Sequence, residues 1–252
     1  MPNNMKLEVE DIAFRYDGTE PLLKGLSFGV ETGEFVSILG PSGCGKSTVL
    51  NLLAGILTPD SGIMRVDGAP FTGMSSHFAY MPQNDLLFPW KTILQNVCLH
   101  GRLHGTEREA RERALELLPL FGLAGYENAW PEDLSGGMRQ RAAFLRTALC
   151  DADILLLDEP FGALDVISRG DMQDWLASMK QHLGRTCLLV THDIDEAIFL
   201  SDRVLVLGGK PAVIHSEYRV EEANRTRDWL YAQSDLRRHL HNSIRGLEAR
   251  TC

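Results

Sequence analysis

Hydrophobic and polar positions along the chain follow two periods, and the N-terminal part follows the period of strands. Loose alternation or short apolar runs predict strands at residues 7–14, 26–30, 34–39, 63–66 and 78–81. Turn residues separate the earliest of these runs, so we expect an antiparallel edge within residues 1–35. The run at 34–39 leads into a glycine-rich turn and then a helix over 46–54.

Beyond residue 84 the apolar positions take helical spacing. This spacing predicts helices over 92–100 and 107–121 and a charged helix after Ser135, which we interpret as a helical subdomain. Strands of the buried type then alternate with helices; the strands are expected at 154–157, 187–190 and 204–207, and the helices at 165–182 and 193–201. Such alternation predicts a mostly parallel sheet with helices on both faces.

The C-terminal region predicts one more amphipathic helix. Its apolar positions fall on one side, at Trp229, Leu236, Leu240, Ile244 and Leu247. The basic residues between them are most simply the solvated face of that helix.

Composition narrows the class of protein. The chain has 252 residues, of which 44% are hydrophobic and 23% charged, as in ordinary globular proteins. Its net charge of −9 argues against a nucleic-acid partner, since phosphate binding usually leaves a basic footprint. No apolar run approaches the roughly 20 residues that cross a bilayer, and the start lacks a secretion signal. The five cysteines are scattered and odd in number, which favours reduced thiols in the cytosol.

A phosphate-binding loop follows the strand at 34–39. It fits the pattern G-x-x-x-x-G-K-[ST] and reads Gly40-Pro41-Ser42-Gly43-Cys44-Gly45-Lys46-Ser47. Its amides and the helix dipole attract phosphate, Lys46 is expected to reach the β- and γ-phosphates, and Ser47 to ligate magnesium. A GTPase would need an Asn-Lys-x-Asp sequence, which does not occur. Kinases and ATPases remain open at this point.

Two adjacent carboxylates, Asp158 and Glu159, end the apolar strand at 154–157. A carboxylate at the end of a buried strand costs free energy unless it has a partner. Asp158 is placed to hold magnesium, commonly through water, and Glu159 to polarise an attacking water. The alternative is a helix cap after a core strand.

Ser135, Gly136 and Gly137 form a second glycine-rich helix start. Free N–H groups and the Ser135 hydroxyl make it another anion site. Two phosphate-binding helix starts in one chain suggest a dimer in which each nucleotide is shared.

Together with Thr191-His192-Asp193, these motifs resemble in order and spacing the nucleotide-binding subunit of an ABC (ATP-binding cassette) transporter. The resemblance covers roughly residues 5–215. It implies an α/β P-loop NTPase core with a mostly parallel sheet, an N-terminal antiparallel β subdomain and an inserted helical subdomain. The implied boundaries are a cassette over 5–218, an insertion over about 84–150 and a helical tail over 219–252.

The resemblance also assigns roles to individual residues. It implies catalytic roles for Glu159, His192, Gln83 and Lys46, and magnesium contacts for Ser47, Gln83 and Asp158. Tyr16 resembles the aromatic residue that stacks on adenine, and Asp165 belongs to a loop that helps to join two cassettes. The implied ATP contacts are Tyr16, Gly40, Pro41, Ser42, Gly43, Cys44, Gly45, Lys46, Ser47, Thr48, Ser135, Gly136, Gly137 and Asp165.

The implied partners follow from the same resemblance. We expect a head-to-tail homodimer that binds ATP and Mg²⁺, separate membrane permease subunits, an extracytoplasmic solute-binding protein, and a peripheral place on the cytoplasmic face of the inner membrane. Residues 84–90 resemble the surface that receives the permease, although Phe88 and Trp90 packed inside the helical subdomain would fit the sequence nearly as well. Alternatives are a soluble ABC ATPase without a transport role and a regulatory module that no longer hydrolyses ATP.

Two details resemble one group of importers. Met138 stands where the family signature usually has glutamine, and a Leu-Phe-Pro-Trp stretch ends at Trp90. Both are similar to importers of the nitrate, sulfonate and taurine group, which includes transporters of thiamine pyrimidine precursors. The sequence of this chain does not identify the solute, because selectivity belongs to the permease and the binding protein.

Overall fold

The computed structural model describes residues 4–222 and 225–248. The chain divides into two compact units: unit 1 is Met1–Phe78 with Gly184–Cys252, and unit 2 is Ala79–Leu183. Cys252 and the last positions of the expected tail lie outside the described residues. The boundaries expected for the cassette, its insertion and its tail stay predictions, because compactness alone does not define them.

Unit 1 is built on one sheet with strand order β5-β4-β1-β2-β10-β9-β3-β8. The first strands pair antiparallel as expected, whereas β3 pairs parallel with both β8 and β9. The strands are β1 (Met5–Phe14), β2 (Leu23–Glu31), β3 (Phe35–Leu39), β4 (Ser61–Val66), β5 (Ala69–Phe71), β8 (Thr186–Thr191), β9 (Arg203–Gly209) and β10 (Ala212–Arg219). β3 and β8 are buried throughout, as parallel strands between helices must be.

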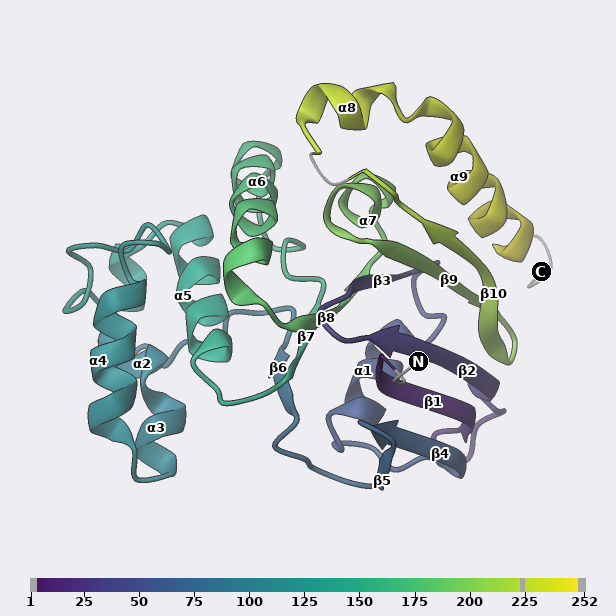
Figure 1. Cartoon of the computed structure of the whole chain (residues 1–252), viewed down its shortest axis with the longest axis horizontal. Coiled ribbons are helices and arrows are strands. Elements are labelled where there is room, and N and C mark those ends of the chain that lie inside the picture. The colour runs from purple at the N-terminus through teal and green to yellow at the C-terminus, as the bar shows by residue number, and fades with distance from the viewer. Residues whose placement is uncertain (1–3, 223–224, 249–252) are drawn as a thin grey trace. The chain divides into compact units, whose positions relative to one another are not determined.

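Four helices belong to unit 1: α1 (Lys46–Leu53), α7 (Ile194–Leu200), α8 (Arg227–Ala232) and α9 (Ser234–Glu248). α1 packs on β8, α7 packs on β3 and β8, and α9 packs on β9 and α7. Figure 1 shows α8 and α9, in yellow, following each other past α7 and the β9–β10 hairpin. The C-terminal segment is therefore part of the packed body of unit 1.

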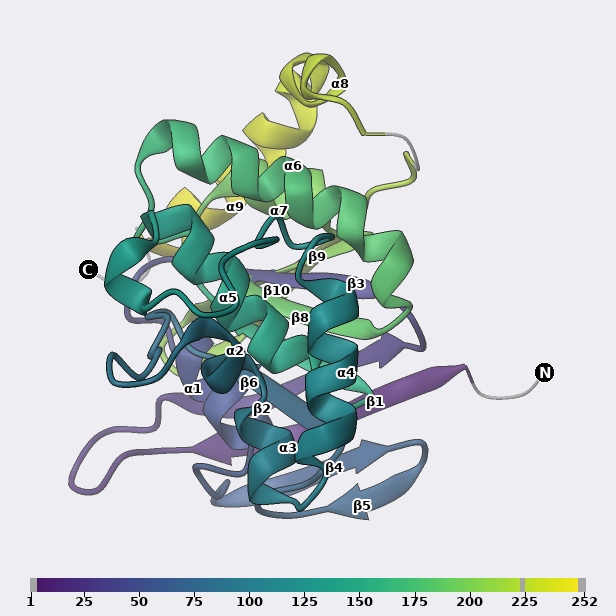
Figure 2. The same cartoon turned by 90° about the vertical axis from the view of Figure 1, so that its left-hand side faces the viewer.

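Unit 2 combines two neighbouring strands with helices. Its strands are β6 (Phe78–Met81), whose first residue still belongs to unit 1, and β7 (Ile154–Asp158). Its helical elements are α2 (Ile93–Val97), α3 (Leu99–Leu103), α4 (Glu107–Leu117), the 3-10 turn η1 (Pro131–Asp133), α5 (Gly136–Ala148) and α6 (Val166–Leu183). α4 packs beside α3 (Figure 2), α2 packs on α5, and α5 packs on α6. Phe121, Phe144 and Trp175 form an aromatic core between α5 and α6.

Several elements differ from the sequence prediction, among them β5 and η1, which were not expected. The helix expected over 92–100 is two five-residue helices, α2 and α3, which meet at Cys98. The single C-terminal helix is likewise broken, at Gln233, and Leu230 rather than Trp229 is its buried N-terminal anchor. β10 was not predicted, because its outer half is polar and a register shift between Ile214 and Ser216 breaks its alternation.

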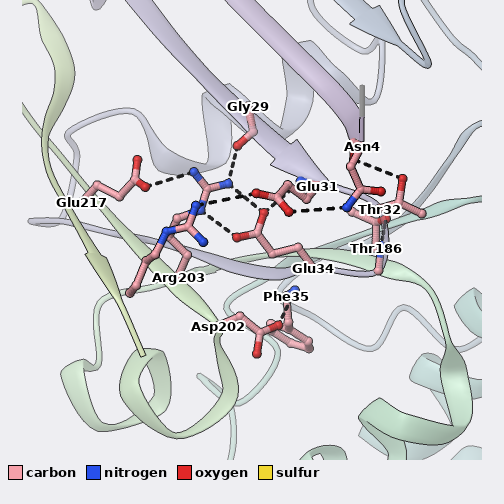
Figure 3. Close-up of polar contacts among 12 residues, drawn as sticks. Asn4, Gly29, Glu31, Thr32, Glu34, Phe35, Thr186, Asp202, Arg203 and Glu217 are labelled. Atoms are coloured by element: carbon pink, nitrogen blue, oxygen red, sulfur yellow. Dashed lines mark hydrogen bonds and ion pairs between the residues drawn. The ribbon is translucent and has the colours of Figure 1, made fainter. Parts of the chain in front are cut away.

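A buried ion-pair network fastens the sheet of unit 1 (Figure 3). Arg203 on β9 donates to both Glu34 carboxylate oxygens at 2.7 Å and to the Gly29 carbonyl at 2.6 Å. A weaker contact of 3.2 Å reaches Glu217 on β10. Burial alone would lower the pKa of Arg203, but Glu34 and Glu217 outweigh burial and raise that pKa. One guanidinium thus ties three strands and the β2–β3 turn together.

Over the residues that the structure describes, no helix has the length and apolarity needed to cross a membrane.

Candidate nucleotide-binding site

The glycine-rich loop of unit 1 has the shape of a phosphate cradle. It joins β3 to α1, and Gly45 at its end has a left-handed backbone with φ of 103°. A Cβ atom on Gly40 would lie 2.3 Å from the Leu207 carbonyl oxygen, so only glycine fits there. The Lys46 ammonium group donates to the carbonyl oxygens of Gly40 and Pro41, each at 2.9 Å. The lysine is therefore held inside the loop, where a phosphate would meet it.

The parallel register of β3 and β8 brings His192 to this loop. Leu39 lies opposite Thr191 in the register, so Gly40 and His192 are the next residues at the same sheet edge. The side chains of His192 and Ser47 are both exposed at that edge. Two segments far apart in the sequence thus lie at the same edge of the sheet.

The Tyr16 side chain is hydrogen-bonded to helix α1, which follows the phosphate loop. Its hydroxyl lies 3.1 Å from the Thr48 hydroxyl, and its ring meets Phe14 edge-on at 4.9 Å between centroids. The Tyr16 side chain remains 44% exposed. A half-exposed ring held at one end is suited to stacking against a flat ligand.

Cys44 lies inside the loop as a half-buried free thiol. Burial raises its pKa, and the opposing effect of the nearby Lys46 charge is smaller. We infer that Cys44 contributes backbone and shape to the cradle.

Unit 2 carries the acidic residues. Asp158 ends β7 buried, and one of its carboxylate oxygens accepts a hydrogen bond of 3.0 Å from the Tyr80 hydroxyl on β6. Burial first, and then the Asp158 charge, raise the pKa of Tyr80, so its hydroxyl keeps the proton that it donates. Tyr80 was not predicted, and its position three residues before Gln83 is the signal that could have found it.

Glu159 and Gln83 both lie close to Gly162. A Cβ atom on Gly162 would sit 3.2 Å from Gln83 Nε2 and 3.7 Å from Glu159 Oε2. The Glu159 backbone is left-handed, with φ of 44°, a costly conformation for a residue other than glycine. Strain of this kind concentrates at functional sites, and it argues against the alternative of an ordinary cap after a strand.

Gln140 on α5 connects these residues to the second glycine-rich helix start. Its side-chain amide donates to the carbonyl oxygen of Pro160 at 2.6 Å and to that of Gln83 at 3.4 Å. Sequence analysis missed this residue. The available signal was a glutamine on the buried face of α5, in line with Ala143, Phe144 and Thr147.

The start of α5 itself is capped as expected. The Ser135 hydroxyl accepts the Met138 N–H at 3.3 Å, while Gly136 and Gly137 are half-buried in the first turn. Asp165 caps α6 in the same manner and is exposed, and its hydrogen bonds, above all with Ser168, lower its pKa. The structure places Ser135 and Asp165 at helix starts, where anions are favoured.

Residues 84–90 carry exposed apolar side chains. Trp90 is 68% exposed and Leu86 59%, while Phe88 is half-buried with its ring 5.2 Å from that of Trp90. Arg139 pairs with Asp85 at 3.2 Å, and Arg146 donates to the carbonyl oxygens of Asp85 and Leu86. The interior alternative therefore does not hold for Trp90. Helix α5 holds Asp85 and Leu86, and Asn96 of α2 hydrogen-bonds to the Phe88 backbone.

Comparison with known proteins identifies the family. The profile of the family described as "ABC transporter" matches residues 23–162, more than half of the chain. The chain belongs to the ABC transporter family. The resemblance and the fold class predicted from the sequence are thereby confirmed.

Named relatives of this ABC ATPase are import subunits. It is 42% identical to the formylaminopyrimidine import ATP-binding protein ThiZ of Halalkalibacterium halodurans, over 96% of this chain and 95% of that protein. It is 50% identical to the aliphatic sulfonates import ATP-binding protein SsuB 1 of Rhodococcus jostii, over 81% and 80%. It is 42% identical to the taurine import ATP-binding protein TauB of Yersinia pestis, over 82% of both.

Solved structures of other family members share the fold of this ABC ATPase. The cbiO1 protein of Clostridium perfringens, part of the transporter complex cbiONQ, matches with a TM-score of 0.79 and 26% identity, over 95% of this chain and 96% of that one. The bacterial ABC cassette MJ0796, whose structure is dimeric, matches with a TM-score of 0.71 and 29% identity, over 86% and 99%. The roles of individual site residues stay predictions.

Proposed function

We propose that this ABC ATPase binds and hydrolyses ATP to power solute import through separate permease subunits. The observation that carries the proposal is the phosphate cradle, in which Lys46 is held by the Gly40 and Pro41 carbonyls beside His192. Membership of the family and the import subunits among its relatives support the same function.

Unit 1 is proposed to bind the nucleotide. The loop amides and Lys46 hold the phosphates, Thr48 supports Tyr16, and Tyr16 stacks on adenine. His192 contacts the γ-phosphate from the neighbouring strand end. Each of these groups comes from an element that the sheet of unit 1 holds in place.

The donor set fits magnesium. Ser47 offers an exposed hydroxyl in the first turn of α1, and Asp158 a carboxylate that Tyr80 orients. Mg²⁺ is proposed to be held by Ser47, Gln83 and Asp158 with phosphate oxygens, and when bound it neutralises phosphate charge.

Glu159 is proposed to orient and polarise the attacking water. Gln83 lies near it beside Gly162, and Gln140 donates to the backbone carbonyls of Gln83 and Pro160. The site is completed by Ser135, Gly136 and Gly137 of a second copy, which close a site otherwise open to water. This arrangement is a two-fold dimer, and the dimeric cassette structure of a relative supports it.

The proposed solute is a small polar or anionic compound of the nitrate, sulfonate, taurine or formylaminopyrimidine type, since relatives of this chain are named for the import of formylaminopyrimidine, aliphatic sulfonates, taurine and nitrate. The proposed location is peripheral, on the cytoplasmic face of the membrane, with a permease helix seated at residues 84–90 and an extracytoplasmic binding protein that supplies the solute. The exposed Trp90 and Leu86 support the permease contact.

A first experiment tests ATP hydrolysis in the purified full-length protein. Glu159→Gln is expected to keep ATP affinity and lower kcat by about 100-fold or more, because a general base contributes that much. Lys46→Ala is expected to lose ATP binding. The matched control is Glu132→Gln, an exposed carboxylate of η1. Turnover of Glu159→Gln close to that of the control would contradict the assignment of the base.

A second experiment tests transport. The protein is reconstituted with its permease and binding protein in vesicles, and ATPase activity is measured with nitrate, taurine, an alkanesulfonate and a formylaminopyrimidine. Stimulation by one of them is expected. Activity that does not depend on the permease would favour the soluble ATPase, and no stimulation by any of them would contradict the solute class.

A further inference from the structure

Hydrogen bonds join the segment that carries His192 to helix α7. The Thr191 hydroxyl donates to the Glu196 carboxylate at 2.5 Å and accepts the Asp193 N–H at 3.0 Å. The Asp193 carboxylate in turn accepts the N–H groups of Asp195 and Glu196, at 2.8 and 3.2 Å. Any shift of α7 therefore moves the backbone that flanks His192.

Helix α7 has only seven residues. A helix of this length is not stable in water without tertiary contacts, so its neighbours decide its position. β3 and β8 hold one side of α7, and the C-terminal segment contacts it as well.

Three arginines of the C-terminal segment contact α7 at its two ends. Figure 1 shows this segment running past α7. Arg225 is 8% exposed and donates to the carbonyls of Ile198, Phe199 and Ser201, which end the helix. The Arg227 guanidinium lies 4.4 Å from the centre of the Phe199 ring. At the other end, Arg237 on α9 donates to Asp195 in the first turn at 2.5 Å.

Buried apolar side chains anchor helix α9, which carries Arg237, against β9. Leu240 and Leu247 are buried, and the Leu247 side chain lies against Gly208 of β9, where a Cβ atom would come within 2.6 Å of it. α9 also borders the space beside the candidate site. A pocket of 560 Å³ is lined by His192, Asp193, Ile194, Asp195, Arg237, Arg238 and His241.

We propose that the C-terminal segment, residues 225–247, positions His192 through α7, with Arg237 as the positioning residue. The inference rests on the proposed contact of His192 with the γ-phosphate. Arg237 does not touch the nucleotide in this proposal. It fixes the N-terminus of α7, and the Asp193 cap passes that position on to His192.

The test compares two neighbouring arginines in the full-length protein. Arg237→Ala removes the contact with α7 and a hydrogen bond to the Tyr231 carbonyl. Arg238→Ala removes an ion pair with Asp235 inside α9 and serves as the matched control, because Arg238 has no hydrogen bond or ion pair with α7 in the part of the chain that the structure describes. Arg237→Ala is expected to lower kcat for ATP hydrolysis about 3- to 30-fold relative to the control. KM for ATP and the melting temperature should match those of Arg238→Ala, because the phosphate cradle and the apolar anchors of α9 are untouched.

Two further measurements separate positioning from general damage. The exchanged pair Asp195→Arg with Arg237→Asp restores the contact in reverse and is expected to recover most of the lost kcat. Hydrogen exchange of the amides at 191–197 should be faster in Arg237→Ala than in Arg238→Ala.

The outcomes are distinct. Equal hydrogen-exchange rates in the two alanine variants would overturn the positioning proposal, whether or not the wild-type protein hydrolyses ATP. Absence of ATP hydrolysis in the wild-type protein would instead contradict the proposed function. In an active protein, equal kcat values, or an exchanged pair as slow as Arg237→Ala, would overturn the positioning proposal as well.

Discussion

The ion pair between Arg203 and Glu34 makes a quantitative prediction about the stability of unit 1. Both side chains are 9% exposed, and the pair is bidentate with additional hydrogen bonds to backbone. Glu34→Gln would leave the Arg203 charge buried, with the more exposed Glu217 as its remaining acidic contact in the network of Figure 3. Breaking a buried pair by removing one partner costs about 3–5 kcal/mol. Glu34→Gln should lose about that much free energy of unfolding.

Two further variants serve as controls for this predicted loss of free energy of unfolding. Glu217 is 45% exposed, so Glu217→Gln should cost only about 0–1 kcal/mol. The double variant Glu34→Leu with Arg203→Met removes both charges and keeps similar volume. Because a buried pair repays its own desolvation only in part, the double variant should recover most of the loss.

Urea unfolding at neutral pH, followed by far-UV circular dichroism, measures these differences when the slope m is unchanged. A loss below about 1 kcal/mol for Glu34→Gln would refute the reasoning, because it would mean that the guanidinium is solvated in the folded protein. A double variant as unstable as Glu34→Gln would refute it in another way. The Gly29 and Glu31 backbone contacts, rather than the charges, would then carry the stability.

Three other predictions test the candidate site, and a fourth tests a buried thiol between α2 and α3. Tyr16→Ala should weaken ATP binding by about 1–3 kcal/mol and Tyr16→Phe much less, as measured with a fluorescent ATP analogue. Ser135→Ala should cost about 1 kcal/mol of helix stability and reduce ATP-dependent dimerisation in size-exclusion chromatography. Gln140→Leu should lower kcat and the melting temperature together, because the Pro160 carbonyl loses its donor at 2.6 Å. Burial raises the pKa of Cys98 to about 11, so its thiol should resist iodoacetamide at pH 8 until urea unfolds the protein, as mass spectrometry would show.

Sequence reasoning worked where the deciding interactions are local. The phosphate loop could be placed between β3 and α1 because its glycines, lysine and flanking periods lie within one short stretch. Asp158 and Glu159 stood out because charge rarely follows a buried strand without a function.

Sequence reasoning failed where a residue depends on distant partners. Gln140 looks like an ordinary helix residue until its amide is seen at the Pro160 carbonyl. β10 has a polar half-strand that only its pairing with β9 makes regular. The break between α2 and α3 at Cys98 carries no proline or glycine, so local propensity did not mark it.

The parallel register of Leu39 with Thr191 has a consequence for protein synthesis. The phosphate loop leaves the ribosome early, but β8, which lies beside β3, is made only after the whole of unit 2. A nascent chain therefore lacks the strand that places His192 at the loop. Because β3 and β8 are far apart in the sequence, their pairing is a late and slow event in folding. Nucleotide can stabilise only chains that have completed that step, so ATP favours finished protein over partly made protein.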